Sequence, residues 1–196
     1  HFEQLIQARA REKELLEKIA ALETENRKIG KSDKEMANLK KEFQLASQGL
    51  TAMDWVFKAM ALWNDGKFTD LGNAIGYLNE AIRLKSDFAF AYYARGAAYA
   101  GQGQHQLAIQ DYDAAIRLNP TFVSLAYNNK GVAYFELGQR QQAIKDYDDA
   151  IRIAPGNAAA FKNRGDTYAA LEQHKRAIQD YDTAIRLKPD LEIAYN

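Results

Sequence analysis

Two kinds of residue in this sequence have chemistry to offer: three histidines and a recurring set of aspartates. His105 and His174 occupy equivalent places in two separate copies of a repeated segment, and His1 is the first residue. Copies two steps apart keep their side chains apart, so this spacing argues against a shared metal ion. The sequence has no cysteine, no phosphate-binding glycine loop and no recognisable Ser-His-Asp arrangement. We therefore expect no catalytic residue, no metal site and no cofactor.

The aspartates recur with basic residues at fixed spacing, which favours structural ion pairs over acid catalysis or calcium binding. One set lies four residues before an arginine, a spacing that predicts pairs along one helix face: Asp113–Arg117, Asp148–Arg152 and Asp182–Arg186. A second set recurs together with a base that directly precedes a glycine: Asp111 with Arg95, Asp146 with Lys130, and Asp180 with Arg164. We expect the second set to join two helices within each repeat.

These charges belong to a segment that occurs three times, in residues 89–123, 124–157 and 158–191. Its glycines and its prolines keep a step of 35 and then 34 residues: Gly96, Gly131, Gly165 and Pro120, Pro155, Pro189. Aromatic and small residues at helical spacing predict two helices in each copy, separated by a turn. A single helix pair cannot bury its apolar face, so the copies must stack on one another.

The residue pattern resembles the tetratricopeptide repeat (TPR), whose period is 34 residues. The residues that carry the resemblance are Tyr92, Gly96 and Tyr99 in the first helix, Ala108, Tyr112 and Ala115 in the second, and the closing Pro120. The resemblance covers about residues 52–196. It implies an all-α fold, a right-handed TPR superhelical solenoid of antiparallel helix pairs, and a non-catalytic role in protein–protein interaction.

The expected domain organisation has a long coiled-coil-like arm, residues 1–50, ahead of the TPR domain, residues 52–196. Residues 52–88 resemble a degenerate repeat with a first helix from about Asp54 to Asn64 and a turn three residues longer than in the other repeats. Residues 192–196 match the start of a truncated fifth repeat. The chain begins without methionine and ends inside this repeat, so we expect a longer parent protein. The sequence assigns no cellular compartment.

The arm carries apolar residues in steps of four and three, which indicates a coiled-coil seam. The seam residues are Leu15, Ile19, Leu22, Asn26, Ile29, Met36, Leu39 and Phe43. A change of phase predicts either one long helix with a discontinuity or two helices bent near Gly30–Ser32. We expect this seam to join two copies in a homodimer. The alternative is an arm that packs back on its own solenoid.

The stacked first helices predict a concave groove suited to an extended peptide. The residues expected to line it are Phe90, Tyr93, Leu125, Asn128, Asn129, Val132, Phe135, Lys162, Asn163 and Asp166. In the TPR family, an asparagine at the place of Asn129 and Asn163 often hydrogen-bonds the backbone of a bound peptide. Family members that bind acidic chaperone tails use a basic clamp, where this chain has Tyr93, Ala97, Ala159 and Asn163. The resemblance therefore argues against recognition of such tails.

Composition agrees with a protein-binding function. The chain has 26 basic and 26 acidic residues, and this balance gives no support to nucleic-acid or membrane-surface binding. We expect a scaffold or adaptor whose partners are a protein segment and a second copy of the chain, with no nucleic acid and no membrane insertion. Two alternatives are a purely structural oligomer without a peptide ligand and the accessory region of a larger enzyme.

Overall fold

The computed structural model describes residues 50–118 and 123–188. The predicted arm with its seam from Leu15 to Phe43, and the predicted start of a fifth repeat at 192–196, lie outside these residues. The unit that begins at Thr51 is a compact stack of helices. Within the described residues, no helix combines the length and the apolarity that crossing a bilayer requires.

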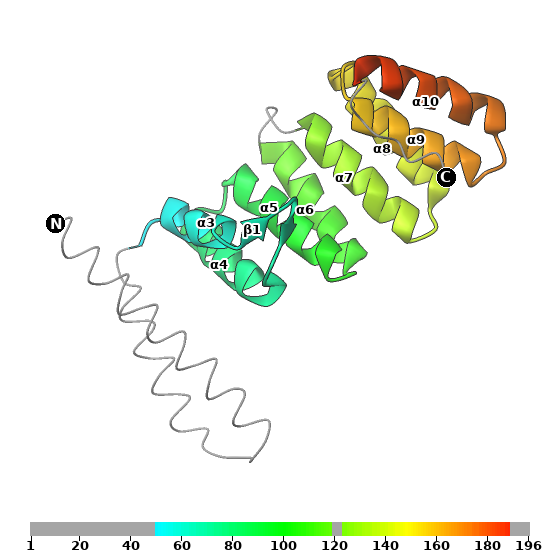
Figure 1. The fold of residues 1–196 in the computed structure, drawn as a ribbon. Coiled ribbons are helices and arrows are strands. Elements are labelled where there is room, and N and C mark those ends of the chain that lie inside the picture. Colours follow the sequence, from blue (N-terminus) through cyan, green and yellow to red (C-terminus); the bar gives the residue numbers. More distant parts are fainter. Residues whose placement is uncertain (1–49, 119–122, 189–196) are drawn as a thin grey trace, which may run out of the picture. The chain divides into compact units, whose positions relative to one another are not determined.

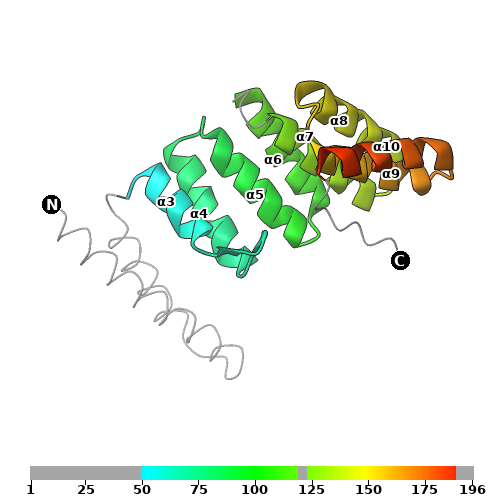
Figure 2. The same cartoon turned by 45° about the horizontal axis from the view of Figure 1, so that its top comes forward.

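Antiparallel helix pairs follow one another along this unit (Figures 1 and 2). The first helices of the pairs are α3 Ala52–Met60, α5 Ala89–Gly101, α7 Val123–Glu136 and α9 Ala158–Ala169. The second helices are α4 Leu71–Leu84, α6 His105–Leu118, α8 Arg140–Ile153 and α10 His174–Leu187. Each second helix packs on its own first helix and, from α4 to α8, on the first helix of the next pair. The fold is the all-α solenoid that the sequence predicts.

A glycine against a tyrosine ring sets the close approach of the two helices in each regular pair. A Cβ atom placed on Gly131 would lie 2.6 Å from the ring of Tyr147, and the equivalent contact between Gly165 and Tyr181 is 2.7 Å. Tyr147 is 1% exposed, so its ring has no free space to move into. Only glycine fits at this crossing, which explains its return in every regular repeat.

The degenerate first pair differs from the sequence-based expectation. Helix α3 ends at Met60 rather than near Asn64, because the chain turns into a short antiparallel hairpin, β1 Trp63–Asn64 and β2 Lys67–Phe68. Asp65 and Gly66 form its tip with φ of 47° and 79°, as a two-residue hairpin turn requires. The longer turn of this pair therefore contains a defined element, the hairpin.

Each regular pair is joined by a turn with one residue in the left-handed region. Gly103 and Gly138 both have φ of 74°, while Glu172 has φ of 59° at the equivalent place in the last pair. Glycine adopts this conformation without a steric penalty, whereas a glutamate does not. The third turn therefore has a less suitable residue than the first two.

Candidate protein-interaction surface

A chain of hydrogen bonds between three side-chain amides and one tyrosine hydroxyl crosses the three regular first helices. Asn163 Nδ2 on α9 donates to Asn128 Oδ1 on α7 at 3.0 Å. Asn128 Nδ2 donates to Asn129 Oδ1 at 3.2 Å, and Asn129 Nδ2 donates to the hydroxyl of Tyr93 on α5 at 3.1 Å. We call these four residues the amide relay. It brings together four of the residues that the sequence assigned to the groove.

The members of the relay differ in what they leave available to a ligand. Asn128 is 7% exposed, so its amide connects its neighbours and presents little surface. Asn129 is held by hydrogen bonds with Asn128 and Tyr93. Burial raises the pKa of Tyr112, and a side-chain hydrogen bond with Asn129 opposes part of that rise. Asn163 is half-buried, and its side chain makes one hydrogen bond within the described residues, through Nδ2. Its amide oxygen and second N–H are therefore the atoms best placed for a ligand.

Burial also raises the pKa of Tyr93, and the hydrogen bond from Asn129 opposes part of that rise. The Tyr93 ring lies 6.3 Å from the ring of Phe90 and 5.9 Å from that of Tyr112, centroid to centroid. The hydroxyl therefore stays neutral and serves as a fixed acceptor at the end of the relay. The geometry supplies no reason to assign it a role in proton transfer.

The apolar residues expected in the groove are only partly covered. Leu125 is 50% exposed, while Val132 and Phe135 are half-buried on the same helix, α7. The guanidinium of Arg140 lies 5.5 Å from the Phe135 ring. Leu125 thus contributes apolar surface that neighbouring residues leave open.

The remaining predicted groove residues, Lys162 and Asp166, pair with each other on α9. Lys162 Nζ lies 2.8 Å from Asp166 Oδ2, and the hydroxyl of Tyr181 donates to Asp166 Oδ1 at 2.9 Å. Both charged side chains stay more than a third exposed, so the pair contributes little to stability. The pair thus adds no net charge to the groove surface of α9.

The second set of predicted ion pairs is confirmed. Each base joins its own first helix to the second helix of the same repeat. The distances are 2.7 Å for Arg95–Asp111, 3.1 Å for Lys130–Asp146 and 2.7 Å for Arg164–Asp180. The carboxylates are almost fully buried, so the bases supply the charge that compensates for their lost hydration.

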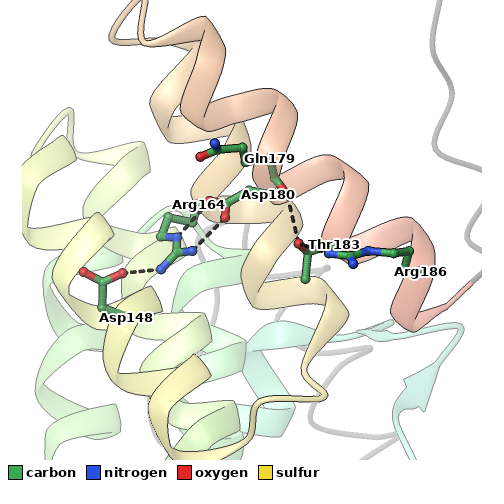
Figure 3. A network of polar contacts seen from close by, with 6 residues as sticks. All are labelled: Asp148, Arg164, Gln179, Asp180, Thr183 and Arg186. Atoms are coloured by element: carbon green, nitrogen blue, oxygen red, sulfur yellow. Dashed lines mark hydrogen bonds and ion pairs between the residues drawn. The ribbon is translucent and has the colours of Figure 1, made fainter.

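The first set is wrong for Asp113 and Asp148, because these acids bind the next repeat instead of the arginine on their own helix. In the third pair, Arg186 Nε reaches the backbone oxygen of Asp182, at 3.4 Å. Asp113 pairs with Lys130 at 3.0 Å, and Asp148 pairs with Arg164 (Figure 3). Arg95 reaches back in the same way, to Asn79 Oδ1 at 2.7 Å. Each base therefore lies between the second helices of two consecutive repeats, an arrangement we call the charge ladder. The i, i+4 rule gave only the neighbours within a helix and missed this longer contact.

Arginine and lysine serve the ladder unequally. Arg164 donates to both carboxylate oxygens of Asp180, at 2.7 and 2.8 Å, and Arg95 binds Asp111 in the same bidentate manner. The ammonium of Lys130 reaches one oxygen of Asp146, and Oδ2 is buried without a partner in the part of the chain that the structure describes. Burial accordingly raises the pKa of Asp146 to about 6, although Lys130 opposes the shift.

Two apolar hollows border the first helices. One, of about 530 Å³, lies beside Phe90 and is lined by Met53, Phe57, Met60 and Leu118 among others. The other, of about 340 Å³, lies between the hairpin and helices α5 and α7, where Asn129 and Val132 form part of its wall. Sequence reasoning missed the hairpin residues that line it, although Asp65-Gly66 between two aromatic residues is a hairpin signal.

No group of three metal-binding side chains occurs within residues 50–118 and 123–188. His105 and His174 begin α6 and α10, at equivalent places in two repeats. The described surface therefore offers shape, amide groups and apolar hollows, and these features are suited to binding a polypeptide.

Comparison with known proteins agrees with this geometry. The family model described as "Tetratricopeptide repeat" matches residues 89–122, 124–157 and 158–191. No curated protein sequence matches the chain. Among solved structures, one described as "Crystal structure of MamA protein" aligns over 100% of both chains with a TM-score of 0.67 and 23% identity, a likeness of fold.

Two further structures align with about half of the chain. The Arabidopsis OM64 TPR domain has a TM-score of 0.51 and 30% identity, with 53% of this chain and 85% of that domain covered. The first TPR of Spaghetti (RPAP3), solved bound to an HSP90 peptide, has a TM-score of 0.50 and 26% identity, with 54% and 83% covered.

Proposed function

Because the chain belongs to the tetratricopeptide repeat family, we propose that it is a non-catalytic scaffold that binds an extended segment of a partner protein. The family mediates protein–protein interactions. The proposed site is the row of first helices, with the groove residues named from the sequence. The proposed domains are the arm, residues 1–50, and the repeats, residues 52–196, divided as the sequence predicts.

The observation that carries this proposal is the amide relay. It holds primary amides in fixed orientations on two successive first helices, α7 and α9, and joins them to the Tyr93 hydroxyl on α5. An extended peptide presents alternating N–H and C=O groups, and an amide side chain can satisfy either. Orientation fixed before binding reduces the entropy lost on association. Asn163, whose amide oxygen has no partner among residues 50–118 and 123–188, is the strongest candidate for direct contact.

The relative bound to an HSP90 peptide supports a peptide as the ligand class. The peptide in that structure has the sequence SRMEEVD, which is acidic. In this chain Tyr93 and Asn163 occupy two of the clamp positions that are basic in tail-binding relatives. The partner segment proposed here is therefore different from an acidic chaperone tail.

A peptide selection tests the groove. Linear peptides of about nine residues, which extend over roughly 30 Å, suit three helices packed about 10 Å apart. Displayed peptides are selected on the 1–196 chain, and synthetic copies of the enriched sequences are measured by fluorescence polarisation. We expect Asn163→Ala to weaken binding about 5- to 10-fold, the effect of one lost hydrogen bond. Gln110→Ala, an exposed amide on the second helix α6, should change nothing.

The same selection separates the alternatives. Unchanged affinity in both Asn129→Ala and Asn163→Ala would remove the groove from the proposal. A structural oligomer without a ligand would give no enriched peptide at all.

We also propose that the arm joins two copies, which would present two grooves and raise avidity without new contacts. Light scattering of the 1–196 chain and of a version that lacks residues 1–50 tests this. We expect a concentration-independent dimer that becomes a monomer on deletion. A monomer in both would eliminate the bivalent scaffold.

A further inference from the structure

We propose that the β1–β2 hairpin makes the adjoining hollow a specificity pocket for a bulky apolar side chain that is flanked by an acidic residue. This inference rests on the proposed function, because the side chain belongs to the peptide in the groove. It adds a site on the hairpin, an insertion that the regular repeats of this chain do not contain.

Hydrogen bonds and side-chain packing hold the hairpin in place as one wall of the hollow. Thr69 closes it, with its N–H and hydroxyl both donating to Leu62 O at 2.8 and 3.0 Å. Phe68 is 6% exposed and anchors the hairpin on the helical stack. Trp63 meets the Phe68 ring edge-on, with centroids 4.8 Å apart, and remains 39% exposed. An indole ring is thus held open to solvent at the mouth of the hollow.

Small residues on α5 create the space opposite this wall. Ala97 and Ala100 line the hollow, and the equivalent places in the next repeat hold Val132 and Phe135. Gly101 allows Leu71 to close the base, since a Cβ atom there would lie 2.9 Å from Leu71 Cδ2. The resulting volume of about 340 Å³ falls at the lower end of the range for ligand pockets. A large single side chain, rather than a whole cofactor, is the occupant that suits it.

Charge narrows the identity of the occupant. Lys67 contributes the one charged side chain of the lining, and the other lining residues are apolar or neutral. No carboxylate in residues 50–118 or 123–188 forms an ion pair with Lys67. Its ammonium is therefore available to a carboxylate of the ligand. An apolar side chain inside and an acid at the rim complement this arrangement.

The pocket is continuous with the amide relay. Asn129 belongs to both, since it donates to Tyr93 and lines the hollow. A peptide that crosses the relay in extended form directs alternate side chains to one side. One of these side chains can enter the pocket while the backbone stays on the row of first helices.

The test uses the synthetic peptides enriched on the 1–196 chain. We expect the enriched sequences to share a Phe, Leu or Trp next to an Asp or Glu. Trp63→Ala should weaken binding about 10-fold or more, the effect of losing a buried aromatic contact. Lys67→Gln should weaken it about 3-fold at low salt and less at high salt. The controls are Leu107→Ala, equally exposed on α6, and Lys175→Gln on α10, and both should bind as the unaltered chain does.

Two further variants keep the result interpretable if Trp63→Ala disturbs the hairpin. Ala97→Leu fills the pocket from the helix and leaves the hairpin intact, and it should also weaken binding. Trp63→Phe keeps an aromatic ring at the same place, so this variant should keep most of the affinity that Trp63→Ala loses.

Failure of the pocket and failure of the groove give different results. Peptides that lose affinity in Asn163→Ala but not in Trp63→Ala, Lys67→Gln or Ala97→Leu would overturn the pocket and leave the scaffold function standing. The absence of any enriched peptide would overturn both.

Discussion

Lys130 Nζ lies 3.1 Å from Oδ1 of Asp146, and Oδ2 of the same buried carboxylate has no hydrogen-bond partner among the described residues. In the other two regular repeats the equivalent base is an arginine, and its guanidinium binds both oxygens of the buried carboxylate. The chain thus contains its own comparison of the two bases in one structural setting. A lysine compensates the charge of the buried carboxylate but hydrogen-bonds only one of its two oxygens.

Replacing Lys130 with arginine should stabilise the protein. A guanidinium at this place would donate to Asp146 Oδ2 as well as Oδ1, and an unsatisfied buried acceptor costs about 1–3 kcal/mol. We expect the free energy of unfolding to rise by about 1 kcal/mol in urea titrations at pH 7. The converse variant, Arg164→Lys, should lower it by a similar amount. Equal stability in all three proteins would show that the unpartnered oxygen has no energetic cost.

The same carboxylate predicts a pH effect. Its pKa of about 6 in the folded protein exceeds the ordinary value of 3.8, so the folded protein binds the proton more tightly than the unfolded chain does. The resulting stabilisation is fully present below pH 3.8 and is lost as the pH rises through 6. Its full size is at most about 3 kcal/mol, from about two pKa units.

Asp146→Asn isolates this contribution, because the amide cannot ionise and still offers Oδ1 to Lys130. We expect the unfolding free energy of the variant, relative to the unaltered chain, to be higher at pH 7.5 and to converge towards it at pH 4.5. Urea titrations at the two pH values measure this difference. Parallel pH dependence in the two proteins would contradict the assignment.

The glycine–tyrosine crossing predicts opposite effects for two glycine substitutions. Gly131→Ala places a methyl group 2.6 Å from the Tyr147 ring and should lower the unfolding free energy by about 1–3 kcal/mol. Gly76→Ala, in the middle of α4 with no atom within 4 Å of the new Cβ, should raise it by about 0.5–1 kcal/mol. Thermal unfolding of the pair tests the crossing, and a stabilised Gly131→Ala variant would refute it.

The turn between α9 and α10 offers a stabilising change. Glu172 has φ of 59° where the preceding repeats place Gly103 and Gly138. Glu172→Gly should remove the steric cost of this conformation and raise the free energy of unfolding by about 1 kcal/mol. The greater conformational entropy of the unfolded variant reduces this gain. Denaturant titration measures the result. Glu172→Ala keeps a Cβ atom and serves as the control, with little change expected.

The sequence predicted the regular repeats well, because three copies report the same small and aromatic residues at the same spacing. It also predicted the pairs within a repeat, such as Arg164–Asp180, since both members recur together. It missed the contact between Asp148 and Arg164, because these residues belong to different repeats and only the stacking geometry brings them together. The hairpin was missed for another reason. Residues 52–88 occur once, and helical periodicity up to Leu62 concealed a turn that Asp65-Gly66 encodes.

The amides show a further limit of sequence reasoning. Asn128, Asn129 and Asn163 were assigned to one groove on their spacing, and hydrogen bonds do join them in one relay. Spacing alone could not show that Asn128 is buried, or that Asn129 is held by neighbours while the Asn163 oxygen stays unused. These differences depend on side-chain conformations, which the residue types do not specify.

The charge ladder has a consequence for how such a protein can change in length. The repeats at residues 89–123 and 124–157 each bring one base, one acid for their own base and one acid for the base that follows. A copied block of 34 residues therefore carries both halves of its junction, and a duplication of residues 124–157 would recreate the same contacts at the new boundary. Growth by whole repeats leaves these charges balanced, and the junction also accepts one extra residue, because Asp113 and Lys130 pair across 17 positions where Asp148 and Arg164 pair across 16.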